Sequence, residues 1–526
     1  MKGRIQVVMC RLCSTGGGVL DVDALLRIAS DAPNVGAAVV VDRLCDKATV
    51  ASLAAQAKDK EVDRVLLLTC PKNEVSPFVY QTFVKKARIN EFLIDSIDLN
   101  NEVVLPHRDD AQGAQAKAEG RLLSSISRMA RLQPLERKTD EMRTKNVVVI
   151  GAGISGLEAA GQAAQRGLHT VILEKTGREV KAPGVVMPES KVVSMKGEAG
   201  NYVLTIEAGQ KRENLECAAI VVATGGDWSD ARGPLADKCR DAKPLYRLRQ
   251  AVDEDRVPTG TVVIVDTPDP KGTRTKVQDY AWDEALDCAM DIKRKSPSTE
   301  VYLVFQEMRV SGMREIAYKE AADLAVRFIR YDRKNPPRLT AKDSGRLELT
   351  DLAQGEAVAL PFDVLAYASI AANPDNVAIA NALRIPLSPD GGVRRGSMQR
   401  GPVATPRPGI FVCGSAMFPK SESAARAEGR AAGIMAAQYA GAGKTEYGGS
   451  VAETDAEKCS ACLTCVRTCP YEAPFIGAAG KAEIRLQMCQ GCGMCVGICP
   501  SKAIDLHHYT DEQIAAETTT YLRGDF

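Results

Sequence analysis

The sequence predicts an α/β protein with three parts, and three observations support this fold class. Strand-like apolar segments alternate with helical segments through residues 1–138, as expected for a small parallel sheet. A larger alternating region, residues 139–445, opens with a branched apolar strand and a Gly-x-Gly-x-x-Gly turn. Residues 446–526 instead carry a cysteine motif that occurs twice with the same spacing. A chain of 526 residues has room for three such domains.

Composition narrows the possible functions. The net charge is +1, with 68 Lys and Arg against 67 Asp and Glu, which argues against binding to nucleic acid or an anionic membrane. No apolar run approaches the roughly 18 residues of a membrane-spanning helix, and the N-terminal segment lacks a signal-peptide core. We therefore expect a cytoplasmic protein. In that compartment thiols stay reduced, so the 16 cysteines indicate metal sites rather than disulfides.

The N-terminal domain places its cysteines at the ends of predicted strands. Strands are predicted over residues 5–9, 37–41 and 65–69. Because the carboxyl ends of parallel strands meet at one edge of a sheet, the cysteines beyond them can converge. Four thiolates suit one [4Fe–4S] cluster or one structural zinc, and we favour iron–sulfur because other redox cofactors are predicted in the chain. Buried, unligated thiols are the alternative. The predicted ligands are Cys10, Cys13, Cys45 and Cys70.

The glycine turn after residues 147–150 predicts a dinucleotide site. Gly151 would permit the tight turn, Gly153 the close approach of a pyrophosphate, and Gly156 the close packing of helix on strand. The following helix would present its N-terminal amides to the phosphates. A second buried strand ends at Glu174, which can bind a ribose hydroxyl pair and disfavours a 2′-phosphate. The ligand is therefore expected to be FAD or NAD rather than NADP.

Two later segments favour FAD over NAD. The strand ending in Ala223-Thr224-Gly225 resembles the Ala-Thr-Gly strand end of two-dinucleotide-binding flavoproteins. The stretch from Thr405 to Ser415, containing Pro-Gly-Ile-Phe-Val-Cys-Gly, resembles their second flavin signature, T-x-x-P-G-I-F-A-x-G-D. Ser415 stands where that signature has an aspartate on the ribityl chain, and its hydroxyl can still form a hydrogen bond. The resemblance implies a thioredoxin-reductase-like fold with two nucleotide-binding subdomains.

The second nucleotide-binding subdomain is predicted to have lost its ligand. The strand over residues 261–265 is present, but Asp266-Thr-Pro-Asp-Pro270 follows it where a pyrophosphate would lie. Prolines remove N–H donors and the aspartates add negative charge, so both oppose binding of a dinucleotide. We interpret residues 261–345 as a degenerate subdomain used for packing or docking. The flavin would then exchange electrons with iron–sulfur clusters rather than with a nicotinamide.

A helix predicted from about residue 421 to 439 would direct its N-terminus at the flavin ring. Lys420 precedes it and is our candidate catalytic residue, which could hydrogen-bond N5 or O4 of the flavin; an ordinary surface lysine is the alternative. Cys217, Cys239 and Cys288 are scattered and are expected to be unligated, and Cys413 is expected to pack near the flavin. The predicted cofactor-binding residues are Gly151, Gly153, Ile154, Ser155, Gly156, Glu174, Lys175, Val193, Ala223, Thr224, Gly225, Gly414, Ser415, Lys420 and Ala424.

The C-terminal cysteine motif is the most specific signal in the sequence. The pattern Cys-x-x-Cys-x-x-Cys-x-x-x-Cys-Pro occurs twice and is the bacterial two-cluster ferredoxin signature. In each run three cysteines bind one [4Fe–4S] cluster and the fourth crosses to the other. The first cluster is therefore expected to bind Cys459, Cys462, Cys465 and Cys499, and the second Cys489, Cys492, Cys495 and Cys469.

Taken together, the chain resembles the A-subunit of heterodisulfide reductase over nearly its full length. The resemblance rests on the N-terminal cysteine motifs, on Gly151–Gly156, and on Gly414-Ser-Ala-Met-Phe-Pro-Lys420, which is similar to G-T-A-x-x-P-K-D. An internally inserted ferredoxin domain and the cysteines of the middle domain are missing, as in relatives that serve quinone-interacting complexes. The family implies FAD, cytoplasmic complexes, homodimerisation and partner subunits that carry the substrate site. Some members bifurcate electrons at the flavin.

The leading hypothesis is an electron-transfer subunit with FAD and three [4Fe–4S] clusters. The histidines (His107, His169, His507 and His508) lie near no motif, and no nucleophile–base pair is evident, so substrate chemistry is assigned to a partner. One alternative is a self-contained NAD(P)H:ferredoxin oxidoreductase that resembles the small subunit of glutamate synthase. The other is a scaffold whose N-terminal cysteines hold zinc.

Overall fold

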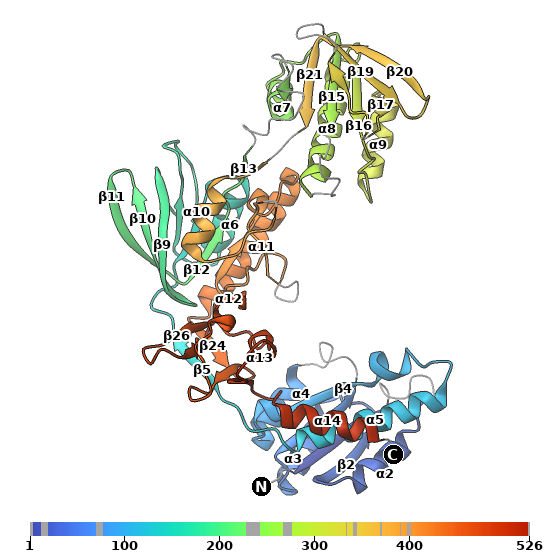
Figure 1. Ribbon diagram of the computed structural model, residues 1–526, viewed down its shortest axis with the longest axis vertical. Coiled ribbons are helices and arrows are strands. Elements are labelled where there is room, and N and C mark those ends of the chain that lie inside the picture. Colours follow the sequence, from blue (N-terminus) through green and yellow to red (C-terminus); the bar gives the residue numbers. More distant parts are fainter. Residues whose placement is uncertain are drawn as a thin grey trace. The chain divides into compact units, whose positions relative to one another are not determined.

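The structure is a computed structural model that describes residues 4–11, 19–69, 77–227, 242–266, 276–332, 334–339, 345–368, 371–389, 391–396 and 401–523 (Figure 1). It forms two compact units. The first joins both ends of the sequence, residues 1–139 and 446–526, and the second comprises residues 140–445. Within the described ranges, no helix is long and apolar enough to cross a membrane.

The N-terminal part of the first unit is a parallel sheet with the strand order β2-β1-β3-β4. Its central strands consist entirely of buried residues, which explains their continuous apolar runs. Aspartate side chains cap three of the helices, Asp21 for α2, Asp46 for α3 and Asp110 for α5. The elements are β1 (Ile5–Cys10), α2 (Val22–Asp31), β2 (Val35–Val41), α3 (Lys47–Asp59), β3 (Arg64–Thr69), α4 (Pro77–Thr82), β4 (Ile94–Asp98) and α5 (Ala111–Met129).

The ferredoxin-like part of the same unit is built from short elements around its cysteines. Two antiparallel pairs, β25 with β28 and β26 with β27, flank two short helices. These elements are β25 (Ala452–Thr454), α12 (Thr464–Thr468), β26 (Pro474–Ile476), β27 (Ala482–Ile484), α13 (Met494–Gly497) and β28 (Ile504–Leu506). The repeated sequence thus forms two similar halves, and each strand pair combines one strand from each half.

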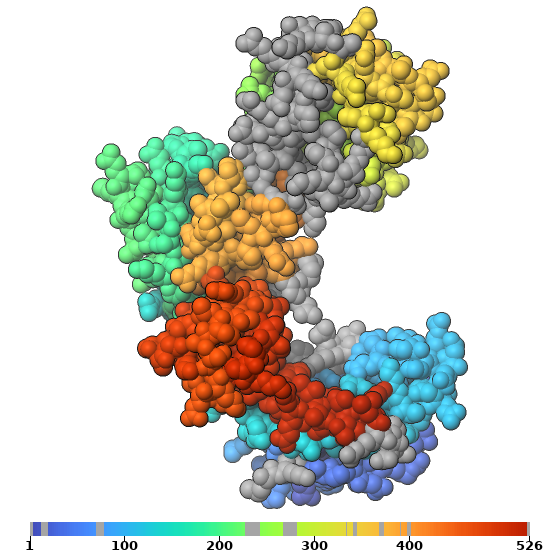
Figure 2. All heavy atoms as spheres, viewed as in Figure 1, coloured from blue at the N-terminus to red at the C-terminus, as the bar shows by residue number. Residues whose placement is uncertain are grey.

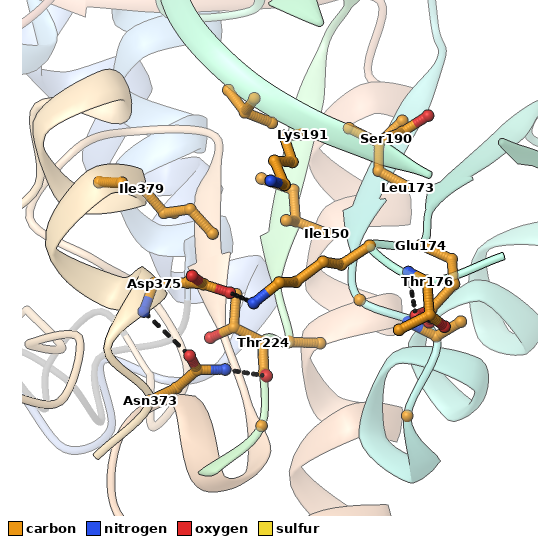
Figure 3. Close-up of a pocket in the computed structure, with 18 of the residues that line it drawn as sticks. Ile150, Leu173, Glu174, Thr176, Ser190, Lys191, Thr224, Asn373, Asp375 and Ile379 are labelled. Atoms are coloured by element: carbon orange, nitrogen blue, oxygen red, sulfur yellow. Dashed lines mark hydrogen bonds and ion pairs between the residues drawn. The ribbon is translucent and has the colours of Figure 1, made fainter. Parts of the chain in front are cut away.

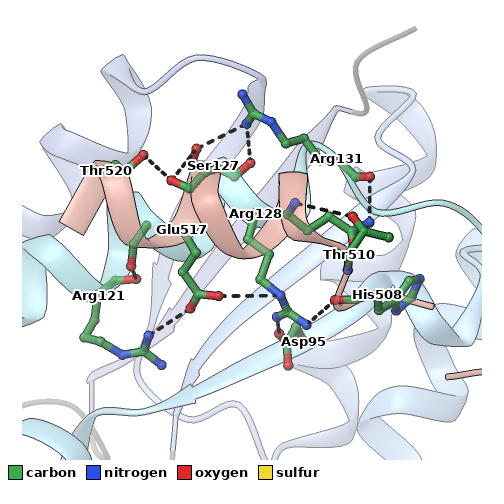
Figure 4. A network of polar contacts seen from close by, with 12 residues as sticks. Asp95, Arg121, Ser127, Arg128, Arg131, His508, Thr510, Glu517 and Thr520 are labelled. Atoms are coloured by element: carbon green, nitrogen blue, oxygen red, sulfur yellow. Dashed lines mark hydrogen bonds and ion pairs between the residues drawn. The ribbon is translucent and has the colours of Figure 1, made fainter. Parts of the chain in front are cut away.

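The helix α14 (Asp511–Arg523) returns from the ferredoxin-like part and packs along α5 (Figure 2). Figure 4 shows the polar contacts between them: Arg121 bonds Glu517 at 3.2 Å, and Arg128 lies 3.6 Å from Glu517. Arg128 also bonds Asp95 of β4 at 3.1 Å. The buried side chain of His508 lies 2.7 Å from the carbonyl oxygen of Gln133, and burial lowers its pKa. No sequence signal predicted this return of the chain.

The second unit contains the predicted dinucleotide fold. Its first parallel sheet has the order β23-β12-β6-β7-β8, and a three-stranded antiparallel sheet, β11-β10-β9, accompanies it. The elements are β6 (Val147–Ile150), α6 (Ile154–Gln165), β7 (Thr170–Leu173), β8 (Val185–Met187), β9 (Ser190–Glu198), β10 (Asn201–Ala208), β11 (Lys211–Cys217), β12 (Ala219–Val222), α10 (Asp375–Leu383), β23 (Ile410–Val412) and α11 (Glu422–Gly441).

Helices α6 and α11 pack closely because glycines lie between them. A Cβ atom at Gly429 would be 2.3 Å from the carbonyl oxygen of Ser155, and one at Gly433 would be 2.3 Å from that of Ala159. These backbones therefore touch where any larger residue would separate them. The contact fixes α11 beside the helix that follows the glycine turn.

A second parallel sheet, in the order β14-β21-β15-β16-β17, lies in the same unit and repeats this architecture. The structure therefore confirms an α/β fold with two nucleotide-binding-like subdomains. The elements of this sheet and its helices are β14 (Lys243–Pro244), α7 (Leu245–Asp253), β15 (Thr261–Asp266), α8 (Lys276–Lys295), β16 (Glu300–Phe305), α9 (Arg314–Asp323), β17 (Arg327–Arg330) and β21 (Val364–Ala368). A separate antiparallel sheet consists of β18 (Arg338–Leu339), β19 (Arg346–Asp351) and β20 (Glu356–Pro361). Short pairs are β13 (Gly226–Asp227) with β22 (Ala371–Ala372) and β5 (Arg137–Glu141) with β24 (Lys444–Gly448).

Candidate functional site

The glycine turn between β6 and α6 has the geometry of a phosphate-binding loop. Gly151 has a φ of +109°, and a Cβ atom there would be 2.3 Å from the carbonyl oxygen of Ala223. A Cβ at Gly156 would be 2.0 Å from the carbonyl oxygen of Gly151. Nothing lies within 4 Å of the Cβ position of Gly153, which lines an open pocket. Two glycines are thus required by packing, and the third leaves room for a ligand.

Glu174 follows β7 and is held rigidly beside this turn. Its carboxylate accepts hydrogen bonds from the N–H of Ala152 at 3.2 Å, from the N–H and hydroxyl of Thr176 at 3.0 and 2.8 Å, and from Arg178 at 3.1 Å. Burial opposes ionisation, since the residue is only 6 % exposed, but these donors outweigh it and lower the pKa. The carboxylate is therefore ionised at neutral pH, and these hydrogen bonds fix its orientation.

A pocket of ≈ 300 Å³ opens at the carboxyl edge of the first sheet (Figure 3). This volume suits part of a dinucleotide, such as its adenosine end. Predicted residues that line it are Gly151, Gly153, Glu174, Lys175, Ala223, Thr224 and Gly225. Further lining residues that the sequence did not reveal are Thr176, Arg178, Lys191, Val192, Asn373, Asp375, Ala378 and Ile379.

Half of these missed residues come from α10 and the segment before it. The side chain of Asn373 donates to the carbonyl oxygen of Thr224 at 2.7 Å, and Asp375 forms an ion pair with Lys175 at 2.5 Å (Figure 3). Asn376, fully buried behind the pocket, accepts the Thr224 hydroxyl at 2.7 Å. They lie 149 to 200 residues along the chain from the partners they bond. No local motif links positions so far apart.

The predicted pocket residue Val193 is one position away from the residue that lines the pocket. Val193 is 42 % exposed and does not line it, whereas Val192 is buried and does. The two side chains alternate along β9, so the neighbour points the other way. Ile154, Ser155, Gly156, Gly414, Ser415, Lys420 and Ala424 are also outside this lining.

Several of these residues lie together at the start of α11. A Cβ atom at Gly414 would be 2.3 Å from the hydroxyl oxygen of Ser155, so the second flavin signature touches the helix after the glycine turn. Ser415 follows in the same short turn (Gly414–Ala416). The N–H of Ala424 donates to the N-cap hydroxyl of Ser421 at 3.3 Å. The two flavin motifs are thus adjacent in the fold.

Lys420 is buried rather than a surface lysine. It is 7 % exposed, its ammonium lies 3.9 Å from the ring centre of Phe418, and it forms an ion pair with Glu428. Burial lowers the pKa of Lys420, and the carboxylate of Glu428 opposes that shift. Glu428 also accepts the N–H of Gly414 at 3.0 Å. This glutamate belongs to none of the sequence motifs and was missed from the sequence.

The N-terminal cysteines are described only in part. Cys10 ends β1 and is buried, and its sulfur accepts the N–H of Leu44 at 3.5 Å. That contact brings the neighbouring Cys45, which is exposed, to the same sheet edge. The other predicted ligands, Cys13 and Cys70, lie outside the described residues.

The first ferredoxin-type site is well formed. Cys459, Cys462, Cys465 and Cys499 line a common cavity of ≈ 20 Å³. In the described part of the chain, no three His, Cys, Asp or Glu side chains are spaced to share a single metal ion. The Thr464 hydroxyl and N–H lower the pKa of the Cys462 thiol, which favours the thiolate form that binds iron. Burial instead raises the pKa of Cys465, and that of Cys495 in the second site to about 11.

The thiols predicted to be unligated include three that are buried. Burial raises the pKa of Cys217, Cys288 and Cys413 to about 12. They therefore pack as small apolar side chains. Cys239 lies outside the described residues.

The second sheet carries different residues where a nucleotide would bind. Asp266 ends β15 and is buried, and its carbonyl oxygen accepts the hydroxyl of Tyr331 at 3.2 Å. Gln306, buried after β16, takes the position that Glu174 has after β7. The acidic, proline-containing stretch predicted to oppose binding, residues 267–270, is not among the described residues.

Comparison with known proteins agrees with this arrangement. A sequence profile for an FAD binding domain matches residues 146–184, and one for a 4Fe-4S dicluster domain matches residues 452–500. The chain is similar to the iron-sulfur A-subunit of the CoB–CoM heterodisulfide reductase of Methanocaldococcus jannaschii, with 24 % identity over 98 % of each chain. It is 23 % identical to the A-subunit of the H₂:CoB-CoM heterodisulfide,ferredoxin reductase of Methanothermobacter thermautotrophicus, over 98 % and 96 % of the two chains.

Two further similarities are partial. A protein of Archaeoglobus profundus that is like the heterodisulfide reductase A-subunit is 32 % identical over 44 % of this chain and 34 % of its own. Among solved structures, the thioredoxin reductase of T. acidophilum superposes with a TM-score of 0.39 and 14 % identity, over 56 % of this chain and 98 % of that one.

The fold and the site together define an oxidoreductase that combines an FAD-binding domain with an iron–sulfur domain. Within that class, the full-length relatives confirm the resemblance of this chain to the A-subunit of heterodisulfide reductase.

Proposed function

We propose that this chain is the flavin- and iron–sulfur-containing electron-transfer subunit of a cytoplasmic complex like heterodisulfide reductase. One observation carries the proposal: a single chain has a dinucleotide pocket built around Gly151, Gly153 and Glu174 and a separate cavity lined by four cysteines. The bound FAD would supply conversion between electron pairs and single electrons. The iron–sulfur centres would carry the single electrons.

The residues present fit both cofactors. The N-terminal amides of α6 would bind the pyrophosphate, Glu174 the ribose, and Val192 and Ile379 the apolar adenine. Cys459, Cys462, Cys465 and Cys499 would hold one [4Fe–4S] cluster and Cys489, Cys492, Cys495 and Cys469 another. We assign a third cluster to Cys10, Cys13, Cys45 and Cys70.

Lys420 is the residue we place at the flavin ring. Its burial and the adjacent motifs support that position, since Gly414 and Ser155 are in contact and Glu428 joins Gly414 to Lys420. A cation there would stabilise negative charge on the reduced ring and hold a proton near N5. Glu428 orients the ammonium and maintains its charge against burial.

The partners are proposed to be the other subunits of such a complex, with the substrate site among them. The full-length relatives are themselves named as one subunit of a heterodisulfide reductase. Homodimerisation and a quinone-interacting partner come from the family resemblance alone. Purification of the native assembly, followed by mass spectrometry of its subunits and determination of its mass, tests all three proposals.

The test of the central proposal is anaerobic purification followed by cofactor analysis and reduction. We expect one FAD and about 12 iron atoms per chain, because three [4Fe–4S] clusters contain that number. A content of about eight iron atoms per chain would rule out the N-terminal cluster. Zinc at the N-terminal cysteines would support the scaffold hypothesis. Excess NADH or NADPH should leave the flavin oxidised. Bleaching of the flavin would instead support the self-contained NAD(P)H:ferredoxin oxidoreductase.

A further inference from the structure

The two halves of the ferredoxin-like part differ in what surrounds their cysteines. The motifs are related by an offset of 30 residues, so each residue has a counterpart in the other half. One contact is shared: the N–H of Ala482 donates to the sulfur of Cys459 at 3.4 Å, and the N–H of its counterpart Ala452 donates to Cys489 at 3.4 Å. This shared amide contact provides an internal reference for the differences.

Hydroxyl groups lie beside the cysteines of one site only, within the described residues. The Thr464 hydroxyl oxygen is 3.3 Å from the sulfur of Cys462, and the Ser501 hydroxyl oxygen is 3.7 Å from that of Cys499. A ligating thiolate has no proton, so each hydroxyl must be the donor. The counterparts of Thr464 and Ser501 in the other half are Met494 and Tyr471. Met494 has no hydroxyl, and the hydroxyl of Tyr471 is at the end of a long side chain.

Two more groups of the same site add to this difference. The N–H of Ala503 donates to Cys499 at 3.3 Å. The ammonium of Lys481 donates to the carbonyl oxygen of Cys459 at 2.6 Å, in a partly buried position whose counterpart is the apolar Val451. In the described part of the chain, four donors thus reach the sulfurs of the first site and one reaches those of the second.

Donors and cations near the sulfurs stabilise the added negative charge of a reduced cluster and raise its potential. We infer that Thr464, Ser501 and Lys481 give the cluster at Cys459, Cys462, Cys465 and Cys499 a higher reduction potential than its neighbour. Electrons that enter the ferredoxin-like part therefore settle on this cluster. The inference rests on the proposed pair of clusters and adds to it the direction of electron transfer between them.

The features that would oppose this difference in reduction potential have smaller effects. Asp455 stands where the second half has Arg485, but Asp455 is exposed and paired with Lys458 at 3.0 Å, so water and its partner screen it. The guanidinium of Arg485 lies over the ring of Phe475 at 4.1 Å. Cys489 and Cys495 are more exposed than their counterparts Cys459 and Cys465, and greater exposure would raise the potential of the second cluster. However, Cys462 and Cys492, the most exposed ligands of the two halves, are both exposed. Direct donors to three of the four sulfurs outweigh this difference.

The test is a redox titration of the anaerobic full-length protein, followed by electron paramagnetic resonance. Thr464→Val and Ser501→Ala should each lower the midpoint of the same higher-potential signal and leave the lower one unchanged. Thr464→Ser, which keeps the hydroxyl, should leave the midpoint of the higher-potential signal at its wild-type value. The reciprocal Met494→Thr should raise the lower midpoint and so reduce the gap.

The result that would overturn the inference is a shift of the lower-potential signal in Thr464→Val and Ser501→Ala, or no shift of either signal. Iron content measured on every variant separates this outcome from loss of a cluster. Failure of the wild-type protein to bind about eight iron atoms at the two ferredoxin-type sites would refute the proposed function instead. An intact pair of clusters with equal midpoints would refute only the inferred direction.

Discussion

The two parallel sheets of the second unit share an architecture but differ at their strand ends. In the first sheet β6 leads into Gly151, and Glu174 follows the neighbouring strand β7. In the second, β15 ends at the buried Asp266, and Gln306 follows β16. Both sheets place parallel strands and helices in a similar way, so the framework does not decide which sheet binds a nucleotide. A few residues at the carboxyl edge make that difference.

The largest expected effect comes from replacing one of the two glycines that packing requires beside the first sheet. Gly156→Ala should abolish FAD retention and lower the free energy of unfolding by about 3 kcal/mol, because its Cβ would overlap the Gly151 carbonyl oxygen. The control is Gly161→Ala on the same helix, where the nearest atom to a Cβ is 3.9 Å away. It should raise stability by about 0.5–1 kcal/mol. Bound FAD and denaturant unfolding are the measurements; equal effects of the two variants would contradict the packing argument.

The second test exchanges the acid and its counterpart. Glu174→Ala should weaken FAD binding by about 10- to 100-fold, since a hydrogen bond to a charged group contributes about 1.5–3 kcal/mol. Gln306→Ala should leave FAD affinity unchanged. Titration of the apoprotein with FAD, followed by flavin fluorescence, measures both. A loss of similar size in Gln306→Ala would mean that the second sheet takes part in flavin binding.

A smaller effect should appear as a dependence on pH. The donors around Glu174 lower its pKa below the ordinary value of 4.5. The ionised carboxylate therefore adds its full share of stability above pH 4.5, and that share is lost as the pH falls through the lowered pKa. Glu174→Gln should make the free energy of unfolding less dependent on pH in this range. An unchanged profile would show that the carboxylate is not held as the structure indicates.

The smallest expected difference concerns buried thiols, one near each sheet. Cys217 and Cys288 both have a pKa of about 12 because they are buried, so both should resist alkylation at about pH 8 in the native protein. Peptide mass spectrometry after brief iodoacetamide treatment gives the two rates. Faster labelling of Cys288 would show that the second subdomain opens more readily than the first.

Local patterns were sufficient to predict the framework. The apolar run 147–150, the three glycines and Glu174 belong to one contiguous unit of strand, helix and strand. The cysteines of each motif are likewise close together in the sequence. Such signals depend on neighbouring residues, so they can be recognised without knowing the fold.

The remainder of the site depends on contacts between distant residues. Asn373 and Asp375 contribute through contacts with residues far along the chain. Glu428 is nearer to its partner, but a helical glutamate has no distinctive local pattern. The position of Val192 rather than Val193 depends on the register of β9, which sequence alternation alone could not fix to one residue. The ion pair of Lys420 with Glu428 was not predicted either, because no motif in the sequence contains that glutamate.

The contact between α5 and α14 has a consequence for biosynthesis. Arg121 bonds a glutamate located 396 residues further along the chain. A ribosome adding about 5–20 residues per second completes α5 long before it makes α14. The surface of α5 that α14 covers is therefore exposed while the whole second unit is translated.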